Sequence, residues 1–314
     1  MGSNLERPLT IPGARDGHHP ASYGLRSTLA GIIVNLCLAA LKAIAGVTGH
    51  SYALIADAIE SLTDVFSSLI VYVGLRVAMR PPDENHPYGH GKAEPMASAM
   101  VSAGLLFAAG AIAYKSVHEI RTPHMMPAPF TLLVLPIVVI AKEAMFRFVN
   151  RVGNSIDSGA VNTDAWHHRS DALTSAFAFI GISIALIGGK GWEGADDWAA
   201  LFASGVIAVN AFLLLRPAVS ELGDALPGTR LLDEIKPVAI SVPGVIDIEK
   251  CFVRKMGFDY YVDLHVVVDG NLPVRDGHRI AHEVKDAIRI AYPRVADVLV
   301  LVEADTHELS VPRS

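Results

Sequence analysis

Six long apolar segments constrain the fold of this chain more than any other feature of its sequence. An α-helix needs about 20 predominantly apolar residues to cross the hydrocarbon core of a bilayer. We expect six such helices, at Arg26–Val47, Tyr52–Val77, Ala93–Val117, Pro129–Val149, Ala165–Gly188 and Trp198–Arg216. The composition agrees, because only 18% of the 314 residues are charged, whereas soluble domains average roughly 25%.

Positive charges between these segments predict the orientation of the helices. Arg76, Arg80, Arg147 and Arg151 lie in loops on one side of the membrane, and the positive-inside rule places that side in the cytoplasm. Both termini are then cytoplasmic, in a multi-pass protein of the plasma or inner membrane. The first residues contain no apolar region like that of a cleaved signal peptide, so we expect the first helix to act as an uncleaved targeting signal.

A soluble domain is expected from about residue 225. Alternating and amphipathic patterns predict an αββαβ order, with elements at Asp233–Ile240, Val245–Lys255, Asp259–Val268, Val274–Ala291 and Val298–Glu303. About 80 residues are enough for a small α+β domain with its own core. The chain then divides into an N-terminal tail (1–24), a six-helix transmembrane domain (25–224), a cytoplasmic domain (225–306) and a C-terminal tail (307–314).

Three acids, Asp57, Glu60 and Asp64, interrupt the second apolar segment. An ionisable group at membrane depth costs free energy and persists where it faces water, a partner or an ion. On a helix, Glu60 and Asp64 lie one turn apart on one face. His167 and Asp171 repeat this spacing in the fifth segment. Two such pairs on facing helices would supply four ligands to one divalent cation.

Carboxylates with one imidazole form a mixed set of hard and borderline ligands. Such a set suits tetrahedral Zn²⁺ and is compatible with Fe²⁺, Mn²⁺, Co²⁺ or Cd²⁺. His168 follows His167 but points about 100° away around the helix, so we do not expect it to share the site. The alternative interpretation is structural pairing, in which the acids form salt bridges with Lys42 or Lys142.

A second candidate site lies in the loop after the second apolar segment. Asp83, His86 and His90 occur within eight residues there, next to Gly and Pro residues that bend the chain. This loop either closes around a cation or is an ordinary solvated loop.

A third candidate site lies in the predicted soluble domain. His265 points to one face of its strand, and Glu249 and Glu303 are expected on the neighbouring strands. His278 and His282 lie one turn apart on a predicted helix. Because surface His residues near Glu are common in soluble domains, each of these alone is also explained as a solvated side chain.

Three motifs together resemble the cation diffusion facilitator family. They are the runs Ala56–Asp64, His86–Glu94 and Ala165–Asp171. They occur in the family's order, and the resemblance extends from about residue 23 to residue 305. It implies a divalent-metal transporter with six transmembrane helices and a cytoplasmic, ferredoxin-like domain that dimerises.

The family's transport site takes two residues from the second helix and two from the fifth. The resemblance places these ligands at Glu60, Asp64, His167 and Asp171. Glu60 departs from the family pattern, in which the first ligand is most often His or Asp, and its extra methylene leaves the preferred metal open. The His-x-x-x-Asp pair is similar to that of zinc-type members. Asp57 is then a water-facing or neighbouring group rather than a ligand.

The resemblance also implies roles outside the transport site. Asp83, His86 and His90 match a loop site that some members have. Lys92 and Asp224 match a salt bridge that steadies the dimer.

The family's cytoplasmic sites match this chain less completely. His265 and His278 fall on ligand positions, and Glu303 stands where an acid is expected. Glu249 and Leu301 replace His at two other ligand positions. Metal binding by this domain is therefore expected with a reduced ligand set.

These features predict a homodimeric exporter that exchanges Zn²⁺ or a similar divalent cation for protons across the lipid bilayer by alternating access. Metal binds deprotonated carboxylates and neutral imidazole, so binding releases protons and protonation releases metal. We expect neither an enzyme nor an organic cofactor. The net charge of −6 argues against a nucleic-acid partner. The alternatives are a membrane metal sensor or a metalloenzyme using the same ligands, although the sequence has no His-Glu-x-x-His motif.

Overall fold

The computed structural model describes residues 20–48, 52–121, 131–188, 192, 195–226 and 229–305. Within its helices the backbone alone is described at residues 41, 42, 45–48, 52–61, 63, 131, 132, 134, 185, 186, 196, 229 and 230. The chain divides into two compact units, residues 1–219 and 220–314.

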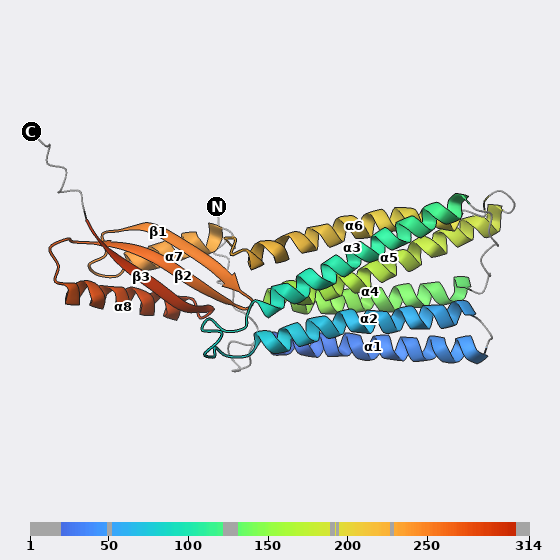
Figure 1. Ribbon diagram of the computed structural model, residues 1–314, viewed down its shortest axis with the longest axis horizontal. Coiled ribbons are helices and arrows are strands. Elements are labelled where there is room, and N and C mark those ends of the chain that lie inside the picture. Colours follow the sequence, from blue (N-terminus) through green and yellow to red (C-terminus); the bar gives the residue numbers. More distant parts are fainter. Residues whose placement is uncertain are drawn as a thin grey trace, which may run out of the picture. The chain divides into compact units, whose positions relative to one another are not determined.

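All six apolar segments form long helices. These are α1 (Ala21–Thr48), α2 (Tyr52–Ala78), α3 (Ala93–Arg121), α4 (Thr131–Ile156), α5 (Gly159–Gly188) and α6 (Ala195–Leu222). α1 and α2 lie side by side along their length, as do α4 and α5 (Figure 1). α2 and α5 also contact each other, which brings the two pairs predicted to bind metal to one interface.

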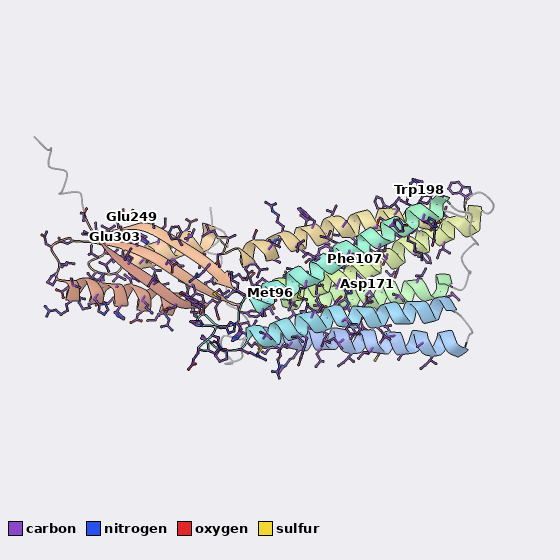
Figure 2. All side chains as sticks on the ribbon, in the orientation of Figure 1. Met96, Phe107, Asp171, Trp198, Glu249 and Glu303 are labelled. Atoms are coloured by element: carbon purple, nitrogen blue, oxygen red, sulfur yellow. The ribbon has the colours of Figure 1, made fainter. Side chains whose placement is uncertain are left out.

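Large apolar side chains cover the outside of these helices. Phe107 on α3 is 81% exposed and Trp198 on α6 is 62% exposed, and both point away from the helices (Figure 2). An apolar surface of this kind is typical of contact with lipid. Among the described residues, three stretches are long and apolar enough to span a membrane, Ala21–Ala40, Ala93–Arg121 and Asp197–Leu222, with mean hydropathies of 1.4, 1.8 and 2.1.

The start of α5 differs from the sequence prediction. The helix begins at Gly159 rather than Ala165, because a buried acid on α3 satisfies its first turn. The Glu94 carboxylate accepts hydrogen bonds from the backbone N–H of Ala160 at 2.7 Å and from the Ser158 hydroxyl at 2.6 Å. Carboxylates stabilise helix N-termini, where N–H groups lack partners within the helix. The polar residues just before Ala165 are therefore helical and not a loop, and Thr163 and Asp164 among them are buried.

The second unit contains a three-stranded sheet and two helices. Its elements are α7 (Thr229–Ile240), β1 (Asp247–Met256), β2 (Asp259–Val268), α8 (Val274–Ala291) and β3 (Val295–Ala304), which confirms the predicted αββαβ order. β1 pairs antiparallel with β2 across a turn at Gly257, whose φ is +65°, and β2 pairs parallel with β3. This parallel pair requires the α8 crossover between its strands.

One face of this sheet carries the core of the unit. Leu264 and Val266 of β2 are fully buried and belong to the same cluster as Ile235 of α7 and Val284 of α8. Because side chains alternate along a strand, His265 of β2 lies on the opposite, open face. That face is where the predicted cytoplasmic ligands are found.

Replacing Glu94 with Ala tests the first turn of α5. We expect a loss of about 1–3 kcal/mol in the free energy of unfolding, because two buried donors lose their acceptor. Thermal unfolding of detergent-purified protein measures this loss. Glu143→Ala is the control, because it breaks only a partly exposed pair with Arg147 on α4, and it should change stability by less than about 0.5 kcal/mol. Unchanged stability of Glu94→Ala would contradict the assignment.

Candidate metal sites

The predicted transport site is a cluster of three side chains from two helices. Asp64 of α2 and His167 and Asp171 of α5 place one ligand atom each within 4.8 Å of one another. His167 Nε2 lies 3.3 Å from Oδ1 of Asp64. Asp64 is 8% exposed, so this cluster lies inside the helical unit. The side chain of Glu60, the predicted fourth ligand, lies outside the described residues.

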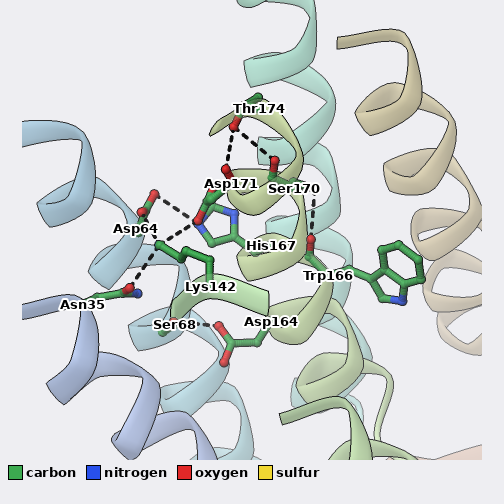
Figure 3. A network of polar contacts seen from close by, with 10 residues as sticks. All are labelled: Asn35, Asp64, Ser68, Lys142, Asp164, Trp166, His167, Ser170, Asp171 and Thr174. Carbon is green, nitrogen blue, oxygen red and sulfur yellow. Dashed lines mark hydrogen bonds and ion pairs between the residues drawn. The ribbon is translucent and has the colours of Figure 1, made fainter. Parts of the chain in front are cut away.

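Lys142 of α4 is bonded to two of these three candidate ligands (Figure 3). Its ammonium donates to Oδ2 of Asp64 at 2.9 Å and to Oδ2 of Asp171 at 2.8 Å. A third hydrogen bond, of 3.0 Å, goes to Oδ1 of Asn35 on α1. The salt bridge considered as an alternative to a metal site therefore exists, and it uses the same carboxylates. The side chain of Lys42 lies outside the described residues.

A second polar pair continues the line of the cluster along α2 and α5. The Ser68 hydroxyl donates to Oδ1 of Asp164 at 2.6 Å, and both side chains are fully buried. Ser68 comes one turn after Asp64, and Asp164 comes one turn before His167, so all four lie on facing sides of the two helices. The sequence prediction missed Asp164 because it started the fifth helix one residue too late to include it. Its spacing of three residues from His167 was the available signal.

His168 does not join the cluster. Its ring is fully buried and lies against Gly31 of α1, where an added Cβ would be 3.1 Å from Nε2 of His168. The ring centroids of His167 and His168 are 6.3 Å apart. Glycine at position 31 accommodates this close approach to α1, since a side chain there would need the imidazole to shift by a few tenths of an ångström.

The three residues predicted for the loop site lie together between α2 and α3. His86 Nδ1 and His90 Nε2 lie 3.1 and 3.4 Å from different oxygens of Asp83. The backbone N–H of His86 donates to the Asp83 carboxylate at 2.7 Å, and this bond is the largest influence that lowers the pKa of Asp83. Gly89 has a φ of +81° and allows the tight turn between the two His residues. The loop thus holds one ionised carboxylate between two imidazoles.

Three of the predicted cytoplasmic ligands come from the three strands of the sheet. One ligand atom from each of three side chains lies within 4.8 Å of the other two; the residues are Glu249 of β1, His265 of β2 and Glu303 of β3. His265 Nδ1 is 2.6 Å from Oε1 of Glu303. A register shift between Ile248 and Lys250 marks a β-bulge at Glu249, and a bulge redirects a side chain in this way.

Three other predicted residues lie outside these clusters. His278 is on α8, where its ring centroid is 4.6 Å from that of His282. Lys92 precedes α3 in the first unit, and Asp224 follows α6 in the second unit with a φ of +56°. Pairing between Lys92 and Asp224 stays a prediction.

Comparison with known proteins supports the same interpretation of the whole chain. Residues 28–222 match the cation efflux transmembrane domain, and residues 227–305 match the cytoplasmic domain of cation efflux proteins. The chain belongs to the cation diffusion facilitator family. It is therefore a metal efflux transporter of a membrane, with its sheet-containing unit in the cytoplasm.

Several relatives share almost the full length of this transporter. The chain is 31% identical to the manganese efflux system protein MneP of Bacillus subtilis, over 87% of this chain and 94% of the relative. It is 32% identical to the magnetosome protein MamB of Magnetospirillum gryphiswaldense, over 85% and 90% of the two chains. The solved MamM-CTD structure is 28% identical and covers 24% of this chain and 95% of its own, with a TM-score of 0.24.

The cytoplasmic cluster predicts a pH-dependent contribution to stability. Hydrogen bonding with the Glu249 carboxyl group and with the His265 ring lowers the pKa of Glu303 below its usual 4.5. A depressed folded-state pKa stabilises the fold above the unfolded-state value, and this stabilisation is lost as the pH falls through the folded-state value. Glu303→Gln should therefore destabilise the second unit above about pH 4.5 and lose this effect in stronger acid.

Urea unfolding of residues 220–314 at a series of pH values measures this difference. Glu283→Gln, which removes a carboxylate from the outer face of α8, controls for the change in net charge. A difference between Glu303→Gln and wild type that is constant or grows towards low pH would contradict the assignment.

Proposed function

We propose that this transporter is a homodimeric exporter that carries a divalent transition-metal ion, with Zn²⁺ as the first candidate, out of the cytoplasm in exchange for protons. The observation that supports this proposal most directly is the meeting of Asp64, His167 and Asp171 within 4.8 Å inside the helical unit. Two carboxylates and an imidazole at this separation are ligands that a borderline divalent ion accepts.

All six helices cross the membrane in this proposal, and both termini are cytoplasmic. The polar groups of α2, α4 and α5 lie between these helices and not on their outer surface. Lys142, for example, is only 2% exposed although it is charged. Ionisable residues in transmembrane segments generally face the interior of the bundle and pair with one another. Residues 25–224 then form the membrane domain, and residues 225–306 form the dimerising cytoplasmic domain.

Proton exchange follows from the chemistry of the ligand set. A carboxylate binds metal when ionised and an imidazole binds metal when neutral, so metal and protons compete for Asp64, His167, Asp171 and Glu60. Movement of α2 and α5 between inward-open and outward-open states would expose the set to each side in turn. The loop cluster and the sheet cluster are proposed as secondary metal sites that sense or stabilise, and the Lys92–Asp224 pair is proposed to steady the dimer.

Mn²⁺ is the second candidate substrate. One relative is named as a manganese efflux protein, and carboxylate ligands suit Mn²⁺ better than imidazole does. Because Glu60 would add a third carboxylate, the ligand set combines features that favour Mn²⁺ with features that favour Zn²⁺. His167 favours Zn²⁺.

Asp64→Ala tests the transport site. We expect proton-driven Zn²⁺ uptake into sealed proteoliposomes to fall to the level of empty liposomes, because one of the described ligands and its charge are lost. Glu119→Ala at the end of α3, far along the chain from the cluster, should transport like wild type. Retained metal/proton exchange by Asp64→Ala would contradict the assignment of Asp64 as a transport-site ligand. Absence of metal flux through the wild-type protein would favour a sensor or an enzyme.

Glu60 is the residue expected to set metal preference. Glu60→His should raise the ratio of Zn²⁺ to Mn²⁺ uptake by about tenfold or more, because imidazole favours Zn²⁺ and carboxylate favours Mn²⁺. Glu60→Asp keeps the carboxylate and should change the ratio less. Uptake of both ions by the same vesicle preparations measures this ratio. An unchanged ratio in both variants would exclude Glu60 as the selectivity residue.

A further inference from the structure

The ammonium of Lys142 occupies a complete three-acceptor site between four helices. It is held by Asp64 of α2 at 2.9 Å, Asp171 of α5 at 2.8 Å and Asn35 of α1 at 3.0 Å. An ammonium has three N–H donors, so each of them has an acceptor. At 2% exposure Lys142 is among the largest fully enclosed side chains in the described part of the chain. The three acceptors thus form a cation-binding site, and the cation that they bind is the side chain of Lys142.

The charges of this site explain why a cation is needed. A buried carboxylate at Asp64 and a partly buried one at Asp171 would be strongly unfavourable without a counter-charge, because charges in a low-dielectric interior must be paired. Lys142 supplies that counter-charge to both Asp64 and Asp171 through one oxygen of each, Oδ2. A positive group therefore lies between the two carboxylates.

A divalent ion on the same carboxylates conflicts with this arrangement. The ion and the ammonium would lie a few ångströms apart and repel each other, while both draw on the same two negative charges. A divalent ion gains about twice the attraction of a monovalent group to each carboxylate at equal distance. It can therefore displace the ammonium, although the repulsion lowers its net affinity.

We propose that Lys142 is a tethered competitor of the transported metal, which fills the place between Asp64 and Asp171 when the site is empty and withdraws when metal binds. This inference rests on the proposed function of Asp64, His167 and Asp171 as metal ligands. It adds that metal release is assisted by return of the ammonium. Lys142 is thus a positioning and affinity-setting residue, not a ligand.

The surroundings offer the displaced ammonium other acceptors. Asn35 is only 1% exposed and is not a candidate metal ligand, so its Oδ1 can keep its hydrogen bond from the Lys142 ammonium when metal binds. Asp164 is fully buried, and among the described residues its Oδ2 has no hydrogen-bond partner. It lies two turns from Asp171 on the same face of α5. The long, flexible lysine stem allows the ammonium to move while its Cα stays in α4.

Lys142→Met removes the charge while keeping the length of the side chain. Zn²⁺ binding is measured by titration calorimetry on the full chain in detergent, in a His86→Ala/His265→Ala background that disables the other two clusters. We expect the dissociation constant to fall by on the order of tenfold or more, because a repelling charge a few ångströms away is gone. Lys142→Arg, which restores the charge, should return the affinity towards that of the background. Lys115→Met on the exposed face of α3 is the neutral control.

Transport kinetics separate competition from a purely structural role. In proteoliposomes Lys142→Met should lower both KM and the maximal rate of Zn²⁺ uptake, because metal binds more tightly and leaves more slowly. A structural role would raise KM or lower the rate alone. An unchanged or weaker Zn²⁺ affinity in Lys142→Met would overturn the inference.

A measurement on the unaltered site covers the case in which Lys142→Met fails to fold. Lysine side chains labelled with ¹⁵N give a signal for the Lys142 ammonium, identified by its absence in Lys142→Arg. This signal should shift in proportion to Zn²⁺ occupancy, and a signal unmoved at saturation would overturn the inference. Failure of the background protein to bind Zn²⁺, or Asp64→Ala binding it as well, would instead contradict the proposed function.

Discussion

The bond between one ammonium and two carboxylates is the interaction on which the helical unit depends. Lys142 connects α4 to α2 and α5 through Asp64 and Asp171, and to α1 through Asn35. Without this pairing, charges on three helices would be buried without compensation, which costs several kcal/mol for each unpaired ion. The arrangement of four helices and the chemistry of the candidate metal site therefore have the same physical cause.

A polar seam lies between the apolar helices. α1, α3 and α6 contain stretches apolar enough to span a membrane by composition. α2 and α5 carry Asp64, Asp164 and Asp171 towards each other. These acids lie between helices, where other side chains of the protein pair with them. In the same way, buried Glu94 stabilises the polar start of α5, since its carboxylate accepts hydrogen bonds from the backbone N–H of Ala160 and from the Ser158 hydroxyl.

Much of the fold and part of the site follow from sequence patterns. Apolar length located six helices, and period-two alternation located β2 at Asp259–Val268, the bounds that the structure has. The spacing of His167 and Asp171 placed both on one helix face, and the structure brings them to Asp64. The boundaries of α5 were predicted less well, because hydropathy cannot recognise Thr163 and Asp164 as buried polar residues whose partners lie on other helices.

The sequence by itself determined the order of the elements and the types of ligand available, because both depend on local periodicity and on side-chain chemistry. Only the tertiary structure decided that Lys142 lies between Asp64 and Asp171, which are 78 and 29 residues away from it in the chain. It likewise decided that Ser68 is the partner of Asp164. The physical reason is that pairing between buried charges depends on which helices pack together, and contacts between distant segments leave no periodic trace in the sequence.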